Sequence, residues 1–148
     1  MNKLTLTSAK ILVAAFAILA PLRVHADAGF VRERLNASIN QIIQNVRETE
    51  DPALKRQMLE NFLNRMDRGI GMAEQIGSKE EVRSLEAMRI KVQADRTELN
   101  GLQGRDRVAD ADLNRFANYI QQDMEQASYV YIGTGTLIII LLILLILL

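Results

Sequence analysis

Residues 31–46 read VRERLNASINQIIQNV, and their apolar side chains recur at the spacing of an α-helix. Neighbouring members of the series are mostly three or four residues apart, so a helix would carry them all on one face. Polar side chains fill the other positions, which predicts an amphipathic helix over about residues 29–47. The members of this apolar stripe are Val31, Leu35, Ile39, Ile42, Ile43 and Val46.

Three further stretches show the same periodicity, at about residues 52–76, at 78–99, and from residue 110 or 112 to 128. Each is about twenty residues long, and few signals typical of strands interrupt them. The second stretch has the broadest expected apolar face, formed by Leu54, Met58, Leu59, Phe62, Leu63, Met66, Ile70 and Ala73. The sequence therefore predicts four amphipathic helices.

The residues between these stretches are typical of helix ends. Asp51 followed by Pro52 predicts an N-cap with proline in the first turn. Ser78 with Glu81 three residues later predicts a capping box. Gly77 is expected to cap the C-terminus of the second helix, and Gly101 follows the end of the third.

Four helices with short links predict an all-α, up-down-up-down helical bundle of about 100 residues, followed by one C-terminal transmembrane helix. In that topology the start of the first helix, the link at residues 77–78 and the end of the fourth helix lie at one end. A long hairpin or coiled coil that completes its core by self-association is the competing architecture.

The N-terminus has the features of a secretory signal peptide. Lys3 and Lys10 precede a ten-residue apolar run, and Val24-His25-Ala26 places small or apolar residues at the two positions that signal peptidase reads. We expect residues 1–26 to be cleaved, after Ala26 or Ala28, while an uncleaved N-terminal anchor is the alternative.

The C-terminus ends in twelve consecutive Leu or Ile residues, 137–148, and no charge occurs back to Tyr129. Twenty helical residues span about 30 Å, the thickness of the hydrocarbon core of a bilayer. Tyr129 and Tyr131 suit the interfacial aromatic belt. The prediction is a C-terminal anchor in the lipid bilayer, Tyr129–Leu148, with the bundle domain of residues 27–128 on the periplasmic (extracytoplasmic) side of a bacterial inner membrane.

The composition excludes several classes of catalytic and binding site. The chain has no Cys and no Trp, and its single His is His25, so thiol and mature histidine chemistry are excluded. Without residues 1–26 the chain has 15 basic and 18 acidic residues, a net charge of −3 that does not favour nucleic acid.

No catalytic, cofactor-binding or metal-binding residue is assigned. Glu33, Glu60 and Glu86 lie off the apolar stripes, where solvated charges are ordinary. The aspartate cluster, Asp106, Asp110 and Asp112, is interpreted as acid at a helix N-terminus. Ser38 and Ser84 have no histidine base in the mature chain.

Three functional hypotheses follow. The first is a membrane-anchored, non-catalytic interaction module that serves as an accessory or scaffold subunit of an envelope complex, with a protein partner or as a homo-oligomer. The second is a membrane-active protein: the plan of an exported domain with a C-terminal span resembles the unimolecular spanins of phage lysis, although the chain has no Cys to carry their N-terminal lipid. The third is an enzyme or ligand-binding bundle.

Overall fold

The computed structural model describes residues 28–128 and 140–141, and this part of the chain is all-helical, with no strand. Two short links and one longer loop, residues 101–109, join four long helices, and a single 3₁₀ turn precedes the last of them. The elements are α2 (Ala28–Glu48), α3 (Pro52–Glu74), α4 (Lys79–Asn100), η1 (Asp110–Asp112) and α5 (Leu113–Ser128). The predicted all-α class and the four helices expected between residues 29 and 128 are confirmed for this part of the chain.

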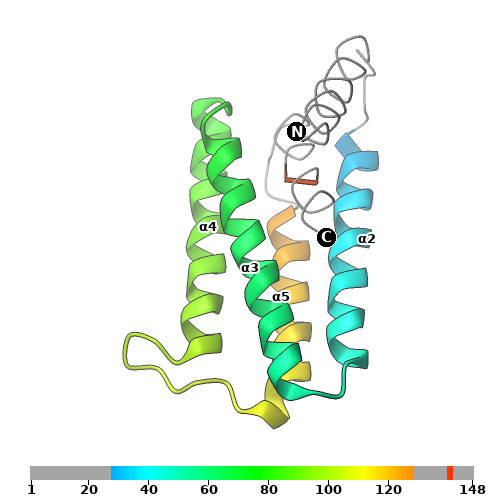
Figure 1. Cartoon of the computed structure of the whole chain (residues 1–148). Coiled ribbons are helices and arrows are strands. Elements are labelled where there is room, and N and C mark those ends of the chain that lie inside the picture. Colours follow the sequence, from blue (N-terminus) through cyan, green and yellow to red (C-terminus); the bar gives the residue numbers. More distant parts are fainter. Residues whose placement is uncertain (1–27, 129–139, 142–148) are drawn as a thin grey trace, which may run out of the picture.

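Successive helices run in opposite directions, as an up-down-up-down topology requires (Figure 1). The start of α2, the α3–α4 turn and the end of α5 lie at one end of the bundle, which we call the turn end. The α2–α3 link and the loop after α4 lie at the other end. The contacts are closest between α3 and α4 and between α2 and α5, so the bundle consists of two tight helix pairs.

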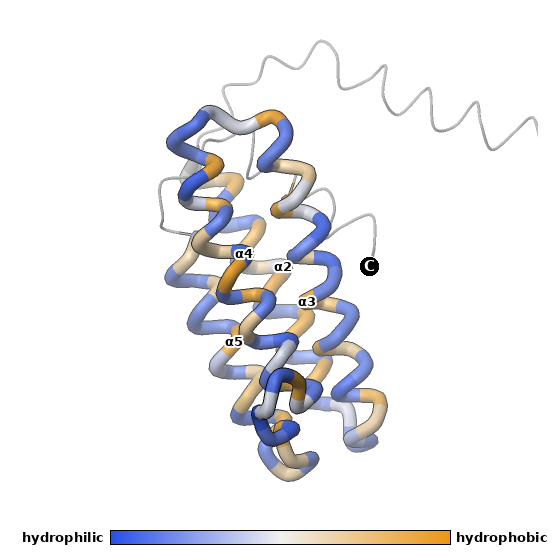
Figure 2. The backbone as a smooth tube through the Cα atoms, turned by 90° about the vertical axis from the view of Figure 1, so that its left-hand side faces the viewer, coloured by the Kyte–Doolittle hydropathy of each residue, from blue (hydrophilic) through white to orange (hydrophobic). Residues whose placement is uncertain are grey.

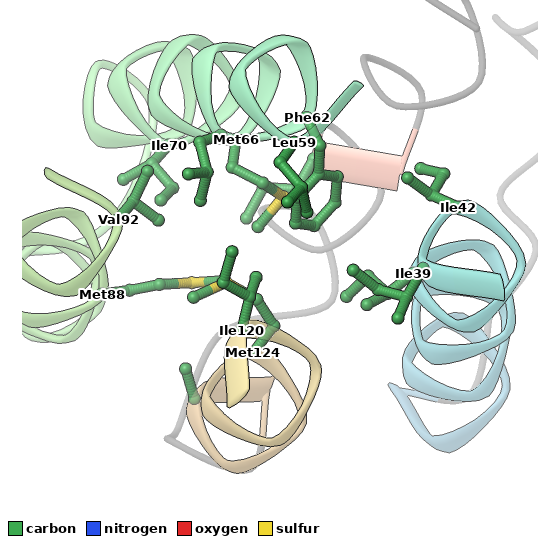
Figure 3. Close-up of a cluster of buried hydrophobic side chains, with 14 of the residues drawn as sticks. Ile39, Ile42, Leu59, Phe62, Met66, Ile70, Met88, Val92, Ile120 and Met124 are labelled. Atoms are coloured by element: carbon green, nitrogen blue, oxygen red, sulfur yellow. The ribbon is translucent and has the colours of Figure 1, made fainter. Parts of the chain in front are cut away.

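A single apolar core lies between the four helices (Figure 3). Its fully buried members include Leu35, Phe62, Leu85 and Ile120, one from each helix. Removing such a side chain from water stabilises the fold by about 1.5–3 kcal/mol each. Figure 2 shows hydrophilic and hydrophobic positions mixed along every helix, as this one-sided burial requires. The core is shared by four helices of one chain, which favours the bundle over the long hairpin.

Most of the expected caps are present. The side chain of Asp51 accepts a hydrogen bond from the backbone N–H of Ala53, and Pro52 begins α3. Ser78 and Glu81 form the reciprocal capping box at the start of α4. Gly101 ends α4 with φ 66°, in the left-handed region where a side chain would be strained.

Two local expectations were wrong. Gly77 does not cap α3, because the helix ends at Glu74 and Gln75 occupies the C-cap position with φ −73°. The backbone N–H of Gly77 instead donates to the carbonyl of Ala73 within the α3–α4 turn. Leu54 was placed on the apolar face, but it lies in the first turn of α3, beyond the core, and is 45% exposed.

The signal peptide expected at residues 1–26 lies outside the described residues, as does most of the predicted transmembrane helix. Ile140 and Leu141 are described: both are helical, and Ile140 is buried in the same core cluster as the bundle residues. Within residues 28–128 and 140–141, no helix is long and apolar enough to cross a bilayer.

Candidate functional site

The most unusual residue of the core is Asp95 on α4. The inward stripe of that helix is apolar at Leu85, Met88, Val92 and Leu99, and Asp95 occupies the remaining place in the series. It is 3% exposed, and its Oδ2 atom has no hydrogen-bond partner among the described residues. A buried carboxylate without a full set of partners destabilises a fold, so core packing alone does not explain an aspartate here.

Other ionisable side chains surround Asp95 at the seam between α4 and α5. Burial, followed by the negative charges of Asp123 and Glu98, raises the pKa of Asp95 to about 7, while the charge of Lys91 acts to lower it. Lys91 pairs with Asp123 across the seam, with 3.0 Å between Nζ and Oδ1. The charge of Asp123 also raises the pKa of the Tyr119 hydroxyl. Asp95 therefore gains and loses a proton near neutral pH.

A cleft of about 650 Å³ opens beside this group of side chains. Glu98 and Tyr119 line the cleft, and both also interact electrostatically with Asp95. Tyr119 is 48% exposed, and its ring stacks on Phe116 with 6.3 Å between the centroids. The other residues that line the cleft are Asp106, Arg107, Val108, Ala109, Asp112 and Arg115. The cleft thus offers an aromatic surface ringed by charges of both signs.

A buried arginine positions one wall of the cleft. The side chain of Arg56, on α3, donates through Nη1 to the carbonyl of Leu99 and through Nη2 to the carbonyl of Val108, both at 2.7 Å. Nη2 also pairs with the carboxylate of Asp110 at 2.7 Å. Since charge-assisted hydrogen bonds are the strong ones, Arg56 fastens the loop after α4 to the bundle and fixes Val108.

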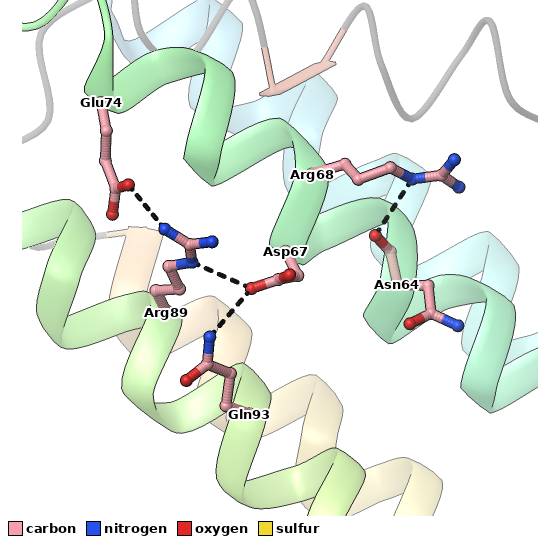
Figure 4. A network of polar contacts seen from close by, with 6 residues as sticks. All are labelled: Asn64, Asp67, Arg68, Glu74, Arg89 and Gln93. Atoms are coloured by element: carbon pink, nitrogen blue, oxygen red, sulfur yellow. Dashed lines mark hydrogen bonds and ion pairs between the residues drawn. The ribbon is translucent and has the colours of Figure 1, made fainter.

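A second polar network joins α3 to α4 on another face (Figure 4). Arg89 donates to Asp67 at 3.0 Å and to Glu74 at 2.9 Å, and Gln93 donates to the same oxygen of Asp67. These acceptors, chiefly the hydrogen bond with Asp67, raise the pKa of Arg89. Arg89, Asp67, Glu74 and Gln93 each have a partner within the network, although Oε1 of Glu74 has none among the described residues. These pairings suit a structural clamp between two helices.

The glutamates and serines considered in the sequence as metal ligands or nucleophiles do not come together in a site. Glu33 and Glu86 are exposed, and Glu60 is half-buried. Within the described part of the chain, no group of three or more His, Asp or Glu side chains is placed to hold a metal ion. The hydroxyls of Ser38 and Ser84 donate to backbone carbonyls four residues earlier.

The three aspartates of the cluster make different contacts in the structure. Asp110 and Asp112 form the η1 turn at the start of α5, as the helix N-terminus interpretation predicts. However, Asp110 pairs with Arg56 and Asp112 pairs with Arg115, so ion pairs hold both carboxylates as well. Asp106 lines the cleft.

Sequence reasoning missed Asp95 and Arg56, although both left a signal. Val92 and Leu99 are two turns apart, and Asp95 fills the position between them on the stripe. Arg56 lies three residues before Leu59, on the inward face of α3. A charged residue at a core position of an amphipathic stripe marks either a partnered group or a functional one.

No family model, curated protein or solved structure matches this chain.

Proposed function

We propose that this protein is a membrane-anchored, extracytoplasmic helical interaction module, an accessory or scaffold subunit of an envelope complex that does not itself catalyse a reaction. Residues 1–26 would direct export, and Tyr129–Leu148 would hold the bundle at the inner membrane. The observation that carries the proposal is the α4–α5 seam, where a cleft beside the half-exposed Tyr119, whose ring stacks on the buried Phe116, adjoins the buried carboxylate of Asp95.

The seam has the composition of a protein-binding surface. Tyrosine and phenylalanine are enriched at interfaces, and arginine offers several hydrogen-bond donors in a fixed geometry. Tyr119 and Phe116 provide an apolar centre, while Glu98 and Arg107 lie at the rim. Aromatic anchors surrounded by charges are typical of the residues that dominate binding energy.

The test is the native mass of the full-length chain, expressed in its membrane and extracted in mild detergent. A stoichiometric partner or a defined homo-oligomer that is lost in Tyr119→Ser and retained in Leu54→Ser supports the proposal. Both side chains are about half exposed and lie on different helices, so Leu54→Ser is a matched control. A monomer with no bound species, or equal loss of the complex in both variants, contradicts it.

One observation favours the membrane-active hypothesis as a second candidate. Ile140 belongs to the apolar C-terminal run, yet it is buried with the bundle core. A segment that can pack on the bundle and also suits a bilayer could insert after release from the bundle. Release of a trapped dye from vesicles, dependent on residues 129–148, would favour this candidate, whereas intact vesicles at saturating protein would exclude it.

A further inference from the structure

The turn end of the bundle bears large apolar side chains that the core does not use. Phe30 is in the first turn of α2, Met72 is in the last turn of α3, and Ile76 is in the α3–α4 turn. They are 55%, 54% and 62% exposed, respectively. Single exposed hydrophobic residues are normal on protein surfaces, and Leu54 and Leu102 are exposed at the other end of the bundle. The turn end has three such side chains, from two stretches of the chain, which requires an explanation.

The exposure of Ile76 is fixed by a well-bonded turn. The backbone N–H of Ile76 donates to the carbonyl of Ala73 at 3.2 Å, and that of Gly77 donates to the same oxygen at 2.9 Å. The capping box of Ser78 and Glu81 holds the other side of the turn. Turns usually select glycine, proline or small polar residues, so no local requirement explains an isoleucine in this one.

The chain that leaves this end indicates what covers the patch. Helix α5 runs towards the turn end and stops at Ser128, before it reaches the level of the α3–α4 turn (Figure 1). The twenty residues that follow contain no charge and finish in twelve Leu or Ile. When residues 129–148 span the bilayer, Ile140 leaves the core cluster, and a segment joined directly to α5 brings the surface of the membrane to the turn end. Phe30, Met72 and Ile76 then lie at the depth where interfacial apolar side chains insert.

The charges around the patch fit an apolar contact better than an electrostatic one. Arg34 lies over the ring of Phe30, 5.4 Å from its centroid, and Lys79 is exposed at the start of α4. Glu33 and Glu80 stand next to these cations in the sequence and are also exposed. Arginine and lysine beside an apolar tip can extend their charged groups towards water or lipid headgroups while their stems stay in the interface. Because the signs are mixed, anionic lipid is not required.

We propose that the turn end is a lipid-docking surface, through which Phe30, Met72 and Ile76 enter the interface of the membrane that anchors the chain. This inference rests on the proposed anchor and adds the orientation of the bundle: its long axis stands away from the bilayer, and the α2–α3 link points into the periplasm.

The chain contains no tryptophan, so single-Trp variants report their surroundings without background. The full-length chain is reconstituted in vesicles with and without brominated acyl chains, which quench tryptophans that they contact. The docking reporters are Phe30→Trp and Ile76→Trp. Leu54→Trp is the matched control, because Leu54 is similarly exposed and lies 18 residues before Met72 on α3, about 27 Å away at the helical rise. Tyr129→Trp reports the anchor.

We expect brominated lipid to quench Phe30→Trp and Ile76→Trp about two-fold, as for side chains at the boundary between headgroups and acyl chains. Leu54→Trp should keep its emission. Zwitterionic and anionic vesicles should give the same result.

The remaining outcomes distinguish a failure of the docking surface from a failure of the anchor. Quenching of Tyr129→Trp without quenching of the two docking reporters would overturn the docking surface and leave the anchor standing. Absence of quenching at Tyr129→Trp would overturn the anchor itself, and the docking surface with it. Equal quenching of Leu54→Trp would mean that the bundle lies flat on the membrane, which contradicts the proposed orientation.

Discussion

Replacing Asp95 with asparagine should stabilise the protein, and the gain should depend on pH. Asparagine has nearly the shape of aspartate but cannot ionise, so the variant isolates the effect of the buried charge. The folded protein holds the proton of Asp95 up to about pH 7, whereas an exposed aspartate releases it near pH 3.8. Protonated Asp95 therefore gives its full stabilisation below about pH 3.8. That stabilisation decreases as the pH rises further and is lost once the pH has passed about 7.

The size of the effect follows from the pKa difference. Three pKa units correspond to about 4 kcal/mol at 1.36 kcal/mol per unit. Asparagine still buries a polar amide beside Asp123 and Tyr119, so we expect a net gain of about 2–4 kcal/mol at pH 8. At about 4–8 °C per kcal/mol for a domain of this length, Tm should rise by about 10 °C or more.

Thermal unfolding of the full-length chain in mild detergent, followed by circular dichroism at 222 nm between pH 4 and pH 9, measures this difference. The gap in Tm between Asp95→Asn and the parent should be small at pH 4, grow to about pH 7 and stay level above it. Glu86→Gln removes an exposed carboxylate from the same helix and should show no such trend. A gap that is absent at pH 8, or that shrinks as the pH rises, would show that the buried charge of Asp95 does not destabilise the fold.

Four further substitutions test the polar contacts and the backbone, each by urea unfolding. Arg56→Met should cost about 2–4 kcal/mol because two carbonyls lose their donor, whereas Asp110→Asn, at an exposed carboxylate, should cost at most about 1 kcal/mol. Equal losses would show that the ion pair, and not the carbonyl bonds, holds the loop. Ser78→Ala should cost about 1 kcal/mol through loss of the capping box, and an unchanged midpoint would argue against that cap. Gly101→Ala should cost about 1–3 kcal/mol, because φ is 66° and the new Cβ would lie 2.7 Å from the backbone nitrogen of Arg107; a neutral result would contradict this backbone conformation.

Periodicity predicted the helices well because core burial dominates their choice. The stripe that begins at Val31 is buried as expected, and α2 spans Ala28–Glu48 against a prediction of about 29–47. The caps at Asp51 and Ser78 were also predictable, because capping is a local interaction between residues close in sequence. The error at Gly77 has a local cause too: the helix ended before the glycine, and a hydrogen bond to Ala73 formed the turn instead.

The candidate site was far less predictable, since its contacts join residues distant in sequence. Arg56 binds carbonyls more than forty residues away, and no pattern around residue 56 specifies those partners. Asp95 faces Tyr119 and Asp123 only because α4 and α5 lie side by side. From the sequence, both positions stand out as charged residues on an apolar stripe. The hydrogen bonds from Arg56 to the loop after α4, and the raised pKa of Asp95, could be recognised only in the folded structure.

The anchoring of the chain by Tyr129–Leu148 is the claim on which both the proposed function and the docking surface depend. Extraction of cell membranes with alkaline carbonate tests it most directly, with the full-length chain compared with a chain that ends at Ser128. Both chains keep residues 1–26, so export is the same for each. We expect the full-length protein to stay in the membrane pellet and the shortened one to be released into the supernatant. Release of the full-length protein, or retention of both, would contradict the proposed anchor.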